Sequence, residues 1–352
     1  MALFSIHNVG ITGIASAVPG IVADNLKLNL LNEDERNAFV KRVGIRRRRI
    51  APPSICASDL CVAAAERLLA ETNDKVEEIG ALVFVTQTPD FLLPGNSMLA
   101  QKRLGLSRST YLVDLNQGCA GYVYGLATLS GIMCSARIKK GLLLVGDTIS
   151  KLISAEDKST LPIFSDAGSA TLLEYTTASD PMFFNLGADG EGAVAIHVRD
   201  GGFRHPFRKQ SLDMQAVGPG IRRAPVHLAM QGVDVLQYSF RHLVPNISEL
   251  LQMAGWDFDQ PDYYVFHQAN KLLNEGLAKK LGLNFAKVPE SLADFGNTSS
   301  ATIPVTINYR LNQLLPHGSH RLVLSGFGVG FSWGSALMQV DSVVCPEIIE
   351  LN

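Results

Sequence analysis

Three polar residues, Cys119, His267 and Asn297, lie in sequence settings where their side chains could take part in nucleophilic chemistry. Cys119 follows a β-like run, is flanked by Gly118 and Gly121, and stands at the start of a long apolar stretch. A thiol at a helix N-terminus faces unpaired N–H groups and the positive end of the helix dipole, so this setting predicts a lowered pKa and a stable thiolate. Gly118 would let a carbonyl approach the backbone closely, so that the Cys119 N–H could donate to an oxyanion. The alternative interpretation is a small apolar side chain buried in a helix.

His267 and Asn297 each stand where a polar pocket could form. His267 ends the predicted strand 263–266 and precedes a helix predicted over 270–281. Such a histidine can be a hydrogen-bonded structural residue, but Gln268 and Asn270 beside it indicate a polar pocket. Asn297 stands in Phe-Gly-Asn-Thr-Ser-Ser, where it could equally be a turn residue with a left-handed backbone.

Strand-like and helix-like segments alternate along the chain, which predicts an α/β fold with buried strands. The clearest run is strand 81–85, helix 98–104, strand 111–115, helix 119–135 and strand 141–145. A weak internal similarity indicates two related halves, because 82–87 resembles 263–268 and matching segments lie roughly 180 positions apart. With the same displacement along the sequence, Cys119 of the first half corresponds to Asn297 of the second half. We therefore expect the polar residues to converge where the halves meet.

The composition indicates a large buried core and a nearly neutral surface. The chain has 352 residues, a net charge of −2, 47% hydrophobic residues and only 18% charged residues. The apolar excess predicts a buried subunit interface, and the small net charge disfavours nucleic acids and anionic lipid as partners. Five cysteines without a Cys-x-x-Cys pair predict neither a disulfide framework nor a metal site. With no secretory signal at the N-terminus, we expect a cytoplasmic protein that needs no cofactor.

One uncharged segment approaches the length of a membrane span. It runs from Asp114 to Arg137 and includes Asn116, Gln117 and four glycines. These polar and small residues predict a helix buried within the protein rather than in a bilayer.

Four motifs together resemble the ketoacyl-ACP synthase III group of the thiolase-like condensing enzymes. They are NQGCAG, VFHQAN, FGNTSSATIP and GFGVGFSWGSALM, and the resemblance extends from about Ile11 through Leu337. It implies two pseudo-duplicated α/β halves in a layered αβαβα arrangement, with residues 1–178 carrying the nucleophile and residues 179–352 carrying the histidine and asparagine. By position, Cys119, His267 and Asn297 match the catalytic residues of the family, and the loop at Gly328 and Val329 matches its second oxyanion donor.

The resemblance implies a two-stage reaction, in a homodimer, on the way to fatty acids, polyketides or other secondary metabolites. A starter acyl group passes from a thioester carrier to Cys119. Malonyl-ACP then loses carbon dioxide, His267 and Asn297 stabilise the enolate, and the carbanion attacks the acyl-Cys119 thioester.

Several positions differ from the family pattern and bear on the acyl donor. The residues that usually sandwich the coenzyme A adenine are a Trp and an Arg, and the matching positions hold Ala38 and Lys158. This leaves acyl-CoA open as a donor and favours a starter delivered by acyl carrier protein. Arg42 opens RVGIRRRRIA, a segment similar to one in the family, and Asn270 ends the HQAN motif. We expect both residues, with Lys158, to bind substrate.

Basic residues near the HQAN motif match the docking face of the family for acyl carrier protein. Lys279 and Lys280 match basic positions, whereas the usual Arg is replaced by Leu272, with Lys271 beside it. The run Arg46–Arg49 adds charge near the expected tunnel mouth, although such a run is usually a solvated face.

The position that closes the family's acyl pocket, across the dimer and just before a proline, matches Leu93. A flexible Leu blocks less space than a Phe, so longer or branched starters are expected. Phe91, two residues earlier, is the other candidate plug.

Other activities remain possible on the same residues. The Cys-bound acyl group could pass to an alcohol or amine without decarboxylation, or the chain could be a non-catalytic partner subunit. GFGVG is also similar to the glycine loop of plant-type polyketide synthases, but HQAN and WGSAL favour the synthase III group. Cys345 lacks the Cys-x-Gly setting of degradative thiolases, and a papain-like protease has no use for the C-terminal glycine loop.

Overall fold

Two mixed β-sheets organise the chain in a computed structural model that describes residues 2–352, apart from the side chains of residues 233 and 234. The first sheet has the strand order β17-β2-β8-β7-β5-β6 and the second has the order β1-β9-β16-β15-β14. The first comprises Ile349–Leu351, Val9–Pro19, Ala167–Tyr175, Lys140–Asp147, Ile79–Val85 and Tyr111–Leu115, in that order. The second comprises Ala2–Ile6, Met182–Ala188, Ser332–Asp341, Ser319–Gly328 and Tyr263–Phe266.

Four strands of each sheet follow the same plan. In the first sheet β5 runs parallel to β7, β7 antiparallel to β8, and β8 antiparallel to β2. In the second sheet β14 runs parallel to β15, β15 antiparallel to β16, and β16 antiparallel to β9. The two duplicated halves expected from the internal similarity are therefore confirmed, with β5 equivalent to β14 and β7 to β15.

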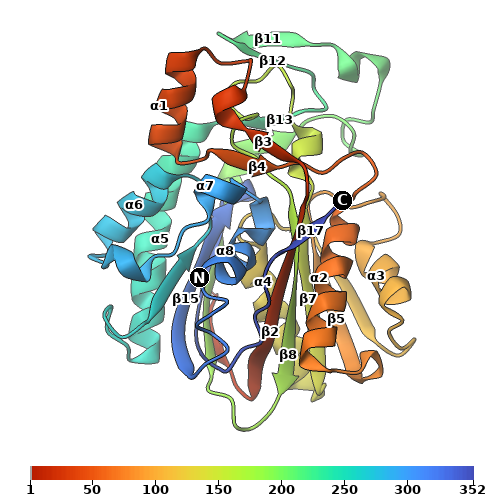
Figure 1. The fold of residues 1–352 in the computed structure, drawn as a ribbon, viewed down its shortest axis with the longest axis vertical. Coiled ribbons are helices and arrows are strands. Elements are labelled where there is room, and N and C mark those ends of the chain that lie inside the picture. Colours follow the sequence, from red (N-terminus) through yellow and green to blue (C-terminus); the bar gives the residue numbers. More distant parts are fainter. Residues whose placement is uncertain (1) are drawn as a thin grey trace.

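Helices form three layers around and between the sheets (Figure 1). Helices α2 and α3 pack on the first sheet, α5 packs on the second with α6 beside it, and α4 and α8 contact both sheets from between them. The layered αβαβα arrangement is confirmed. The helices span Ala57–Thr72 (α2), Asn96–Leu104 (α3), Gly121–Ala136 (α4), Gly232–Ala254 (α5), Lys271–Lys280 (α6) and Thr302–Arg310 (α8).

Helix α4 lies in the middle layer because nothing on it requires water. It carries no charged side chain, and a Cβ on Gly125 would come within 2.7 Å of Leu143 and 2.9 Å of Val85, so glycine lets the helix approach both strands closely. The expected protein-buried helix is thus present, although it begins at Gly121 rather than at Cys119. Among the residues that the structure describes, no helix combines the length and apolarity needed to cross a membrane.

Helices α1 and α7 and three small pairs of strands lie over the ends of the central strands, towards the top of Figure 1. Three two-stranded pairs lie here, β3 with β4, β10 with β13 and β11 with β12. These elements are β3 (Val22–Asp24), α1 (Glu33–Val43), β4 (Arg47–Arg49), β10 (Ile196–Val198), β11 (Gln215–Gly218), β12 (Ile221–Arg223), β13 (Leu228–Met230) and α7 (Leu292–Phe295). Short 3-10 helices span Asn25–Lys27, Val76–Glu78, Ile149–Leu152, Gly190–Gly192, Lys209–Leu212, Phe285–Lys287, Ser299–Ala301 and Val329–Phe331.

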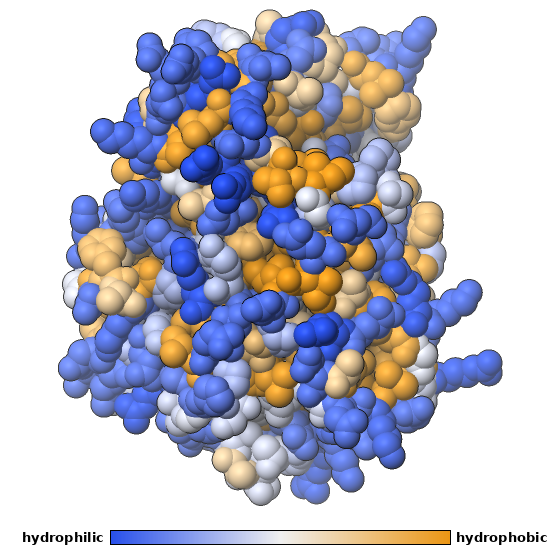
Figure 2. Space-filling view, in the orientation of Figure 1, coloured by the Kyte–Doolittle hydropathy of each residue, from blue (hydrophilic) through white to orange (hydrophobic). Residues whose placement is uncertain are grey.

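The two ends of the chain each join the sheet built mainly by the opposite half. Strand β1 pairs with β9 of the second sheet, and β17 pairs with β2 of the first. The division at residues 178 and 179 stays a prediction, since these exchanged strands tie the halves together. On the face shown in Figure 2, hydrophobic residues reach the surface in patches between hydrophilic ones, as expected of a chain with 47% hydrophobic residues.

Candidate active site

Cys119 lies in the tight turn that joins β6 to α4. The Gly121 N–H donates to the Gly118 carbonyl at 2.7 Å, and the Cys119 side chain is only 7% exposed. The end of β15 packs against this turn, because a Cβ on Gly328 would lie 2.7 Å from the Cys119 Cβ and 2.9 Å from its Sγ. A side chain at position 328 would therefore displace the sulfur, so glycine is required there.

One cavity brings together the residues singled out in the sequence. Cys119, His267 and Asn297 all line it, as do Gly328 and Val329. The other lining residues are mostly apolar and come from both halves and from the covering strands: Gln87, Ile149, Ile163, Phe164, Ile196, Leu228, Met230, Gly232, Val235, Leu236, Ala269, Asn270, Leu273, Ser299 and Phe327. An apolar chamber with a few convergent polar groups suits an acyl chain whose reactive end is polar.

The prediction of a lowered pKa for the Cys119 thiol is wrong for this structure. Burial raises the pKa to about 12, and the negative charge of Asp147 adds to the rise. The nearby Ser299 side chain and the backbone N–H groups of Cys119 and Val329 lower the pKa, but only in part. Removal from water destabilises the thiolate more than these donors stabilise it, so the resting sulfur is a thiol. The backbone N–H groups of Cys119 and Val329 nevertheless both lie near the sulfur.

His267 is held as a neutral imidazole. Burial lowers its pKa to about 3, and its Nδ1 lies 2.7 Å from the Thr302 hydroxyl at the start of α8. The Phe327 ring packs edge-on against the imidazole at a centroid distance of 5.3 Å. These contacts fix the orientation of the ring, which lines the cavity.

The Asn297 carboxamide is oriented by its own loop. Its Oδ1 accepts the Ser299 N–H at 2.9 Å. Backbone hydrogen bonds join Asn297 to Ile163 and Ser165, at 3.1 and 2.9 Å. With the oxygen engaged, the Nδ2 group is the part of the carboxamide that can donate into the cavity.

The three predicted substrate-binding residues outside this centre occupy different places. Asn270 lines the cavity and caps α6, its Oδ1 accepting the Leu273 N–H at 2.9 Å. Arg42 is exposed in the last turn of α1 and does not line the cavity. Lys158 does not line it either, and its ammonium pairs instead with Glu35 of α1 at 3.1 Å.

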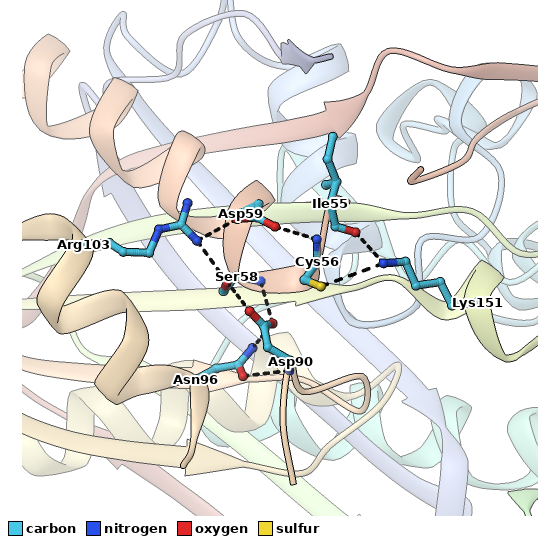
Figure 3. Close-up of polar contacts among 8 residues, drawn as sticks. All are labelled: Ile55, Cys56, Ser58, Asp59, Asp90, Asn96, Arg103 and Lys151. Atoms are coloured by element: carbon cyan, nitrogen blue, oxygen red, sulfur yellow. Dashed lines mark hydrogen bonds and ion pairs between the residues drawn. The ribbon is translucent and has the colours of Figure 1, made fainter. Parts of the chain in front are cut away.

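The candidate plug residues Phe91 and Leu93 lie on an exposed loop, away from the cavity lining of their own chain. Figure 3 shows how Asp90 anchors this loop: its carboxylate accepts from the Ser58 hydroxyl at 2.5 Å and from the Asn96 amide at 3.0 Å. Arg103 completes the network by donating to Ser58 and Asp59, at 3.1 and 2.8 Å. The loop is thus fixed at its base, while its apolar tip faces solvent.

The lysines predicted to dock the carrier protein lie on α6, next to the site. Lys271 begins the helix and forms an ion pair with Glu275, whereas Lys279 and Lys280 end it and are exposed. Lys280 also lies over the Phe240 ring, with its ammonium 5.6 Å from the ring centre.

Sequence reasoning missed several residues of the cavity. Ser299 lines the cavity and Thr302 contacts His267; both follow Asn297 in the same motif, so their hydroxyls were the available signal. Ile196 and Leu228, on β10 and β13, carried no signal, because these strands come from a long connection without a motif. Among the described residues, no group of three or more His, Cys, Asp or Glu side chains could hold a metal ion.

Comparisons with known proteins place these residues in matched regions. Residues 113–190 match the family model of 3-oxoacyl-[acyl-carrier-protein] synthase III, and residues 251–340 match the model of its C-terminal part. A beta-ketoacyl-[acyl-carrier-protein] synthase III of Desulfitobacterium hafniense (strain Y51) is 31% identical over 334 residues, covering 94% of this chain and 98% of that protein.

Solved structures agree with this similarity. A 3-oxoacyl-(acyl-carrier protein) synthase from Burkholderia xenovorans LB400 superposes with a TM-score of 0.93 at 36% identity, covering 99% of both chains. A 3-oxoacyl-(acyl-carrier-protein) synthase III solved at 2.1 Å superposes with a TM-score of 0.90 at 35% identity, covering 94% of this chain and 99% of that one.

Proposed function

Because the chain belongs to the 3-oxoacyl-[acyl-carrier-protein] synthase III family, an acyl-transferring condensing family, we propose that it accepts an acyl group on Cys119 and condenses it with malonyl-ACP. The products are a β-ketoacyl-ACP and carbon dioxide. The observation that carries the proposal is that Cys119, His267 and Asn297 line one cavity.

In the first half-reaction the Cys119 sulfur attacks the carbonyl carbon of an acyl thioester. A new C–S bond forms, the bond to the carrier sulfur breaks, and the thiol proton ends on the departing carrier thiol. Negative charge gathers on the carbonyl oxygen in between, where the N–H groups of Cys119 and Val329 can donate.

In the second half-reaction malonyl-ACP loses its carboxylate as carbon dioxide, and the electron pair of the broken C–C bond moves into an enolate. His267 donates to the enolate oxygen together with the Asn297 Nδ2 group. The enolate carbon then attacks the acyl-Cys119 carbonyl. The new C–C bond forms, the Cys119 sulfur leaves, and it takes a proton from solvent. Two neutral donors suit this step, since a carboxylate in either place would repel the enolate.

We propose acyl carrier protein, rather than coenzyme A, as the carrier of the starter. The small Ala38 on α1 offers no flat surface for an adenine, and the Lys158 ammonium is already paired with Glu35. Acylation of Cys119 should be much faster from acyl-ACP than from the same acyl-CoA in single-turnover measurements. Equal rates from the two donors would refute this assignment.

We propose that the active form is a cytoplasmic homodimer. Phe91, Leu92 and Leu93 are 58, 76 and 84% exposed at the tip of the anchored loop, and the edge strand β6 presents Tyr111 at 51% exposure. An apolar loop beside an unpaired strand is a surface that a second copy can bury. All five cysteines are free thiols, which suits a reducing compartment. Sedimentation should give a dimer, and replacing Leu92 by Asp should give monomers.

Intact mass spectrometry tests the reaction itself. The protein is mixed with an acyl donor and then with malonyl-ACP. An acyl mass on Cys119 that disappears as carbon dioxide is released is the expected result. An acyl mass released only by an alcohol or amine would replace the proposal with plain acyl transfer, and no adduct from any donor would leave a non-catalytic subunit.

A further inference from the structure

Asp147 is a fully buried carboxylate where the two halves meet, and no step of the proposed reaction uses it. It is the last residue of β7 and has no exposed surface. Its Oδ1 accepts the Gln87 N–H at 2.7 Å and the Thr86 hydroxyl at 3.1 Å, just after β5. Its Oδ2 accepts the Ser300 hydroxyl at 2.6 Å and the Ser300 N–H at 3.2 Å. One carboxylate therefore joins strand ends of the first half to the Asn297 loop of the second.

Both ends of this link lie beside the reacting groups. Gln87 lines the cavity, and Ser300 directly follows Ser299, which also lines it. A Cβ on Gly121, two residues after Cys119, would lie 3.3 Å from the Ser300 Cβ. A displacement of Ser300 would thus change the position of Asn297 relative to the Cys119 turn.

No cation in the described part of the chain neutralises Asp147, since none of the ion pairs found there includes it. Hydrogen-bond donors alone stabilise the carboxylate, and bonds to a charged group are stronger than neutral ones. After burial, the charge of Asp147 is the largest influence that raises the pKa of the Cys119 thiol.

We propose that Asp147 is a positioning residue that clamps the loop from Asn297 to Ser300 onto the strand ends of the first half, and so sets the carboxamide against the acylated sulfur. The proposal rests on the proposed function, because it assigns the clamp to the condensation step. Its charge also acts on the sulfur, and that effect can be read without any condensation.

Asp147→Asn tests both effects at once. An Asn has one oxygen in place of two, so its NH₂ group must face either the Gln87 N–H or the Ser300 N–H, and that bond is lost. We expect condensation to slow by roughly 10- to 100-fold, as for loss of a hydrogen bond to a charged group, with acyl transfer to Cys119 unchanged or faster. Alkylation of Cys119 by iodoacetamide at pH 8 should become faster, because removal of the negative charge lowers the pKa of the thiol.

Two matched variants separate the clamp from the charge. Ser300→Ala removes one donor and keeps the carboxylate, so condensation should slow less than in Asp147→Asn and alkylation should be unchanged. Asp166→Asn removes another buried carboxylate, which accepts from Ala51 and Ser150 and is not among the groups that shift the pKa of Cys119. Its alkylation rate should equal that of the wild-type protein.

The possible results distinguish the clamp, the charge effect and the proposed function from one another. Wild-type condensation in both Asp147→Asn and Ser300→Ala would overturn the clamp, as would equal losses of acyl transfer and condensation with unchanged alkylation. If Asp147→Asn does not fold, Ser300→Ala alone decides through a selective loss of condensation or none. A wild-type protein that acylates Cys119 but releases no carbon dioxide from malonyl-ACP would refute the proposed function instead, and the alkylation rates would still test the charge effect.

Discussion

The carboxyl ends of β7 and β15 occupy equivalent places in two sheets of the same plan, yet they bear opposite chemistry. Strand β7 ends in Asp147, a charged acceptor for hydrogen bonds from both halves. Strand β15 ends in Gly328, where the missing side chain admits the Cys119 sulfur. One strand end stabilises the junction of the halves, and the other leaves room for the reacting atom.

The neighbouring pair, β5 and β14, shows the same division. Thr86 and Gln87 follow β5 and donate to Asp147, whereas His267 follows β14 and faces the cavity. The duplicated fold brings the equivalent strand ends of the two halves together at one junction. The residue types at these ends differ, so the residues after β5 support the structure and the residue after β14 faces the cavity. The comparison can be tested by making the same change near the ends of β7 and β15.

The largest expected difference comes from adding one methyl group to each of two glycines. Gly328→Ala should slow acyl transfer to Cys119 by roughly 10²- to 10³-fold, since the new Cβ would lie 2.9 Å from the sulfur and displace it from its oxyanion donors. Gly146→Ala, at the end of β7, would instead meet the Cys61 sulfur at 2.6 Å and the Ala167 carbonyl at 2.9 Å. It should destabilise folding by about 1–3 kcal/mol. Single-turnover acylation and urea unfolding measure the two, and equal activity losses would contradict the assignment.

Asn297→Asp should separate the two half-reactions. A carboxylate would face the forming enolate, so release of carbon dioxide from malonyl-ACP should fall on the order of 10²-fold, while acylation of Cys119 should persist. Acid pH provides the internal control, because a protonated Asp can again donate a hydrogen bond. Unchanged carbon dioxide release at neutral pH would exclude Asn297 from the decarboxylation step.

His267 should make the folded protein less stable in mild acid. Burial holds the pKa of the folded imidazole at about 3 against an ordinary 6.5. Below pH 6.5 the unfolded chain therefore binds a proton that the folded chain cannot, and stability falls by up to about 1.4 kcal/mol per pH unit until the folded pKa is reached.

Urea unfolding at pH 7 and pH 5 measures this dependence. His267→Gln should reduce the difference between the two pH values, whereas the exposed His317→Gln should leave it as in the wild-type protein. A His267 variant with the wild-type dependence would show that the histidine is not buried in solution.

Leu93→Phe should have the smallest effect, a shift in preference and not a loss of activity. A larger ring at the loop tip should disfavour longer acyl groups by roughly 10-fold per added methylene or two, provided that the tip reaches the acyl pocket of a partner. Competition between short and long acyl donors measures the ratio, with Leu92→Phe as the neighbouring control. An unchanged chain-length preference in Leu93→Phe would remove that residue from the acyl pocket.

The clustering of Cys119, His267 and Asn297 around one cavity could be predicted from local sequence, because each residue stands in a distinctive short motif. Cys119 lies between Gly118 and Gly121, Asn297 follows Gly296, and His267 follows an apolar strand, so residue type and strand ends together indicated one junction. The layered fold followed from alternating segments and from the internal similarity. These signals depend on neighbours along the chain.

Other features depend on contacts between distant residues, and local motifs do not contain them. The thiol pKa was predicted in the wrong direction because burial and the charge of Asp147, 28 positions away in the sequence, outweigh the helix terminus. The ion pair between Lys158 and Glu35 of α1 is likewise a contact between residues far apart in the sequence. The apolar cavity walls on β10 and β13 were also not predicted, since nothing in the sequence of those segments distinguishes a residue of a cavity wall from a core residue.

The sequence by itself determined which residues could react and the order of the elements that carry them. Only the tertiary structure decided their protonation states at rest, which are a protonated sulfur and a neutral imidazole. Protonation depends on the water removed and on charges brought near by folding, and both are sums over contacts between segments far apart in the chain.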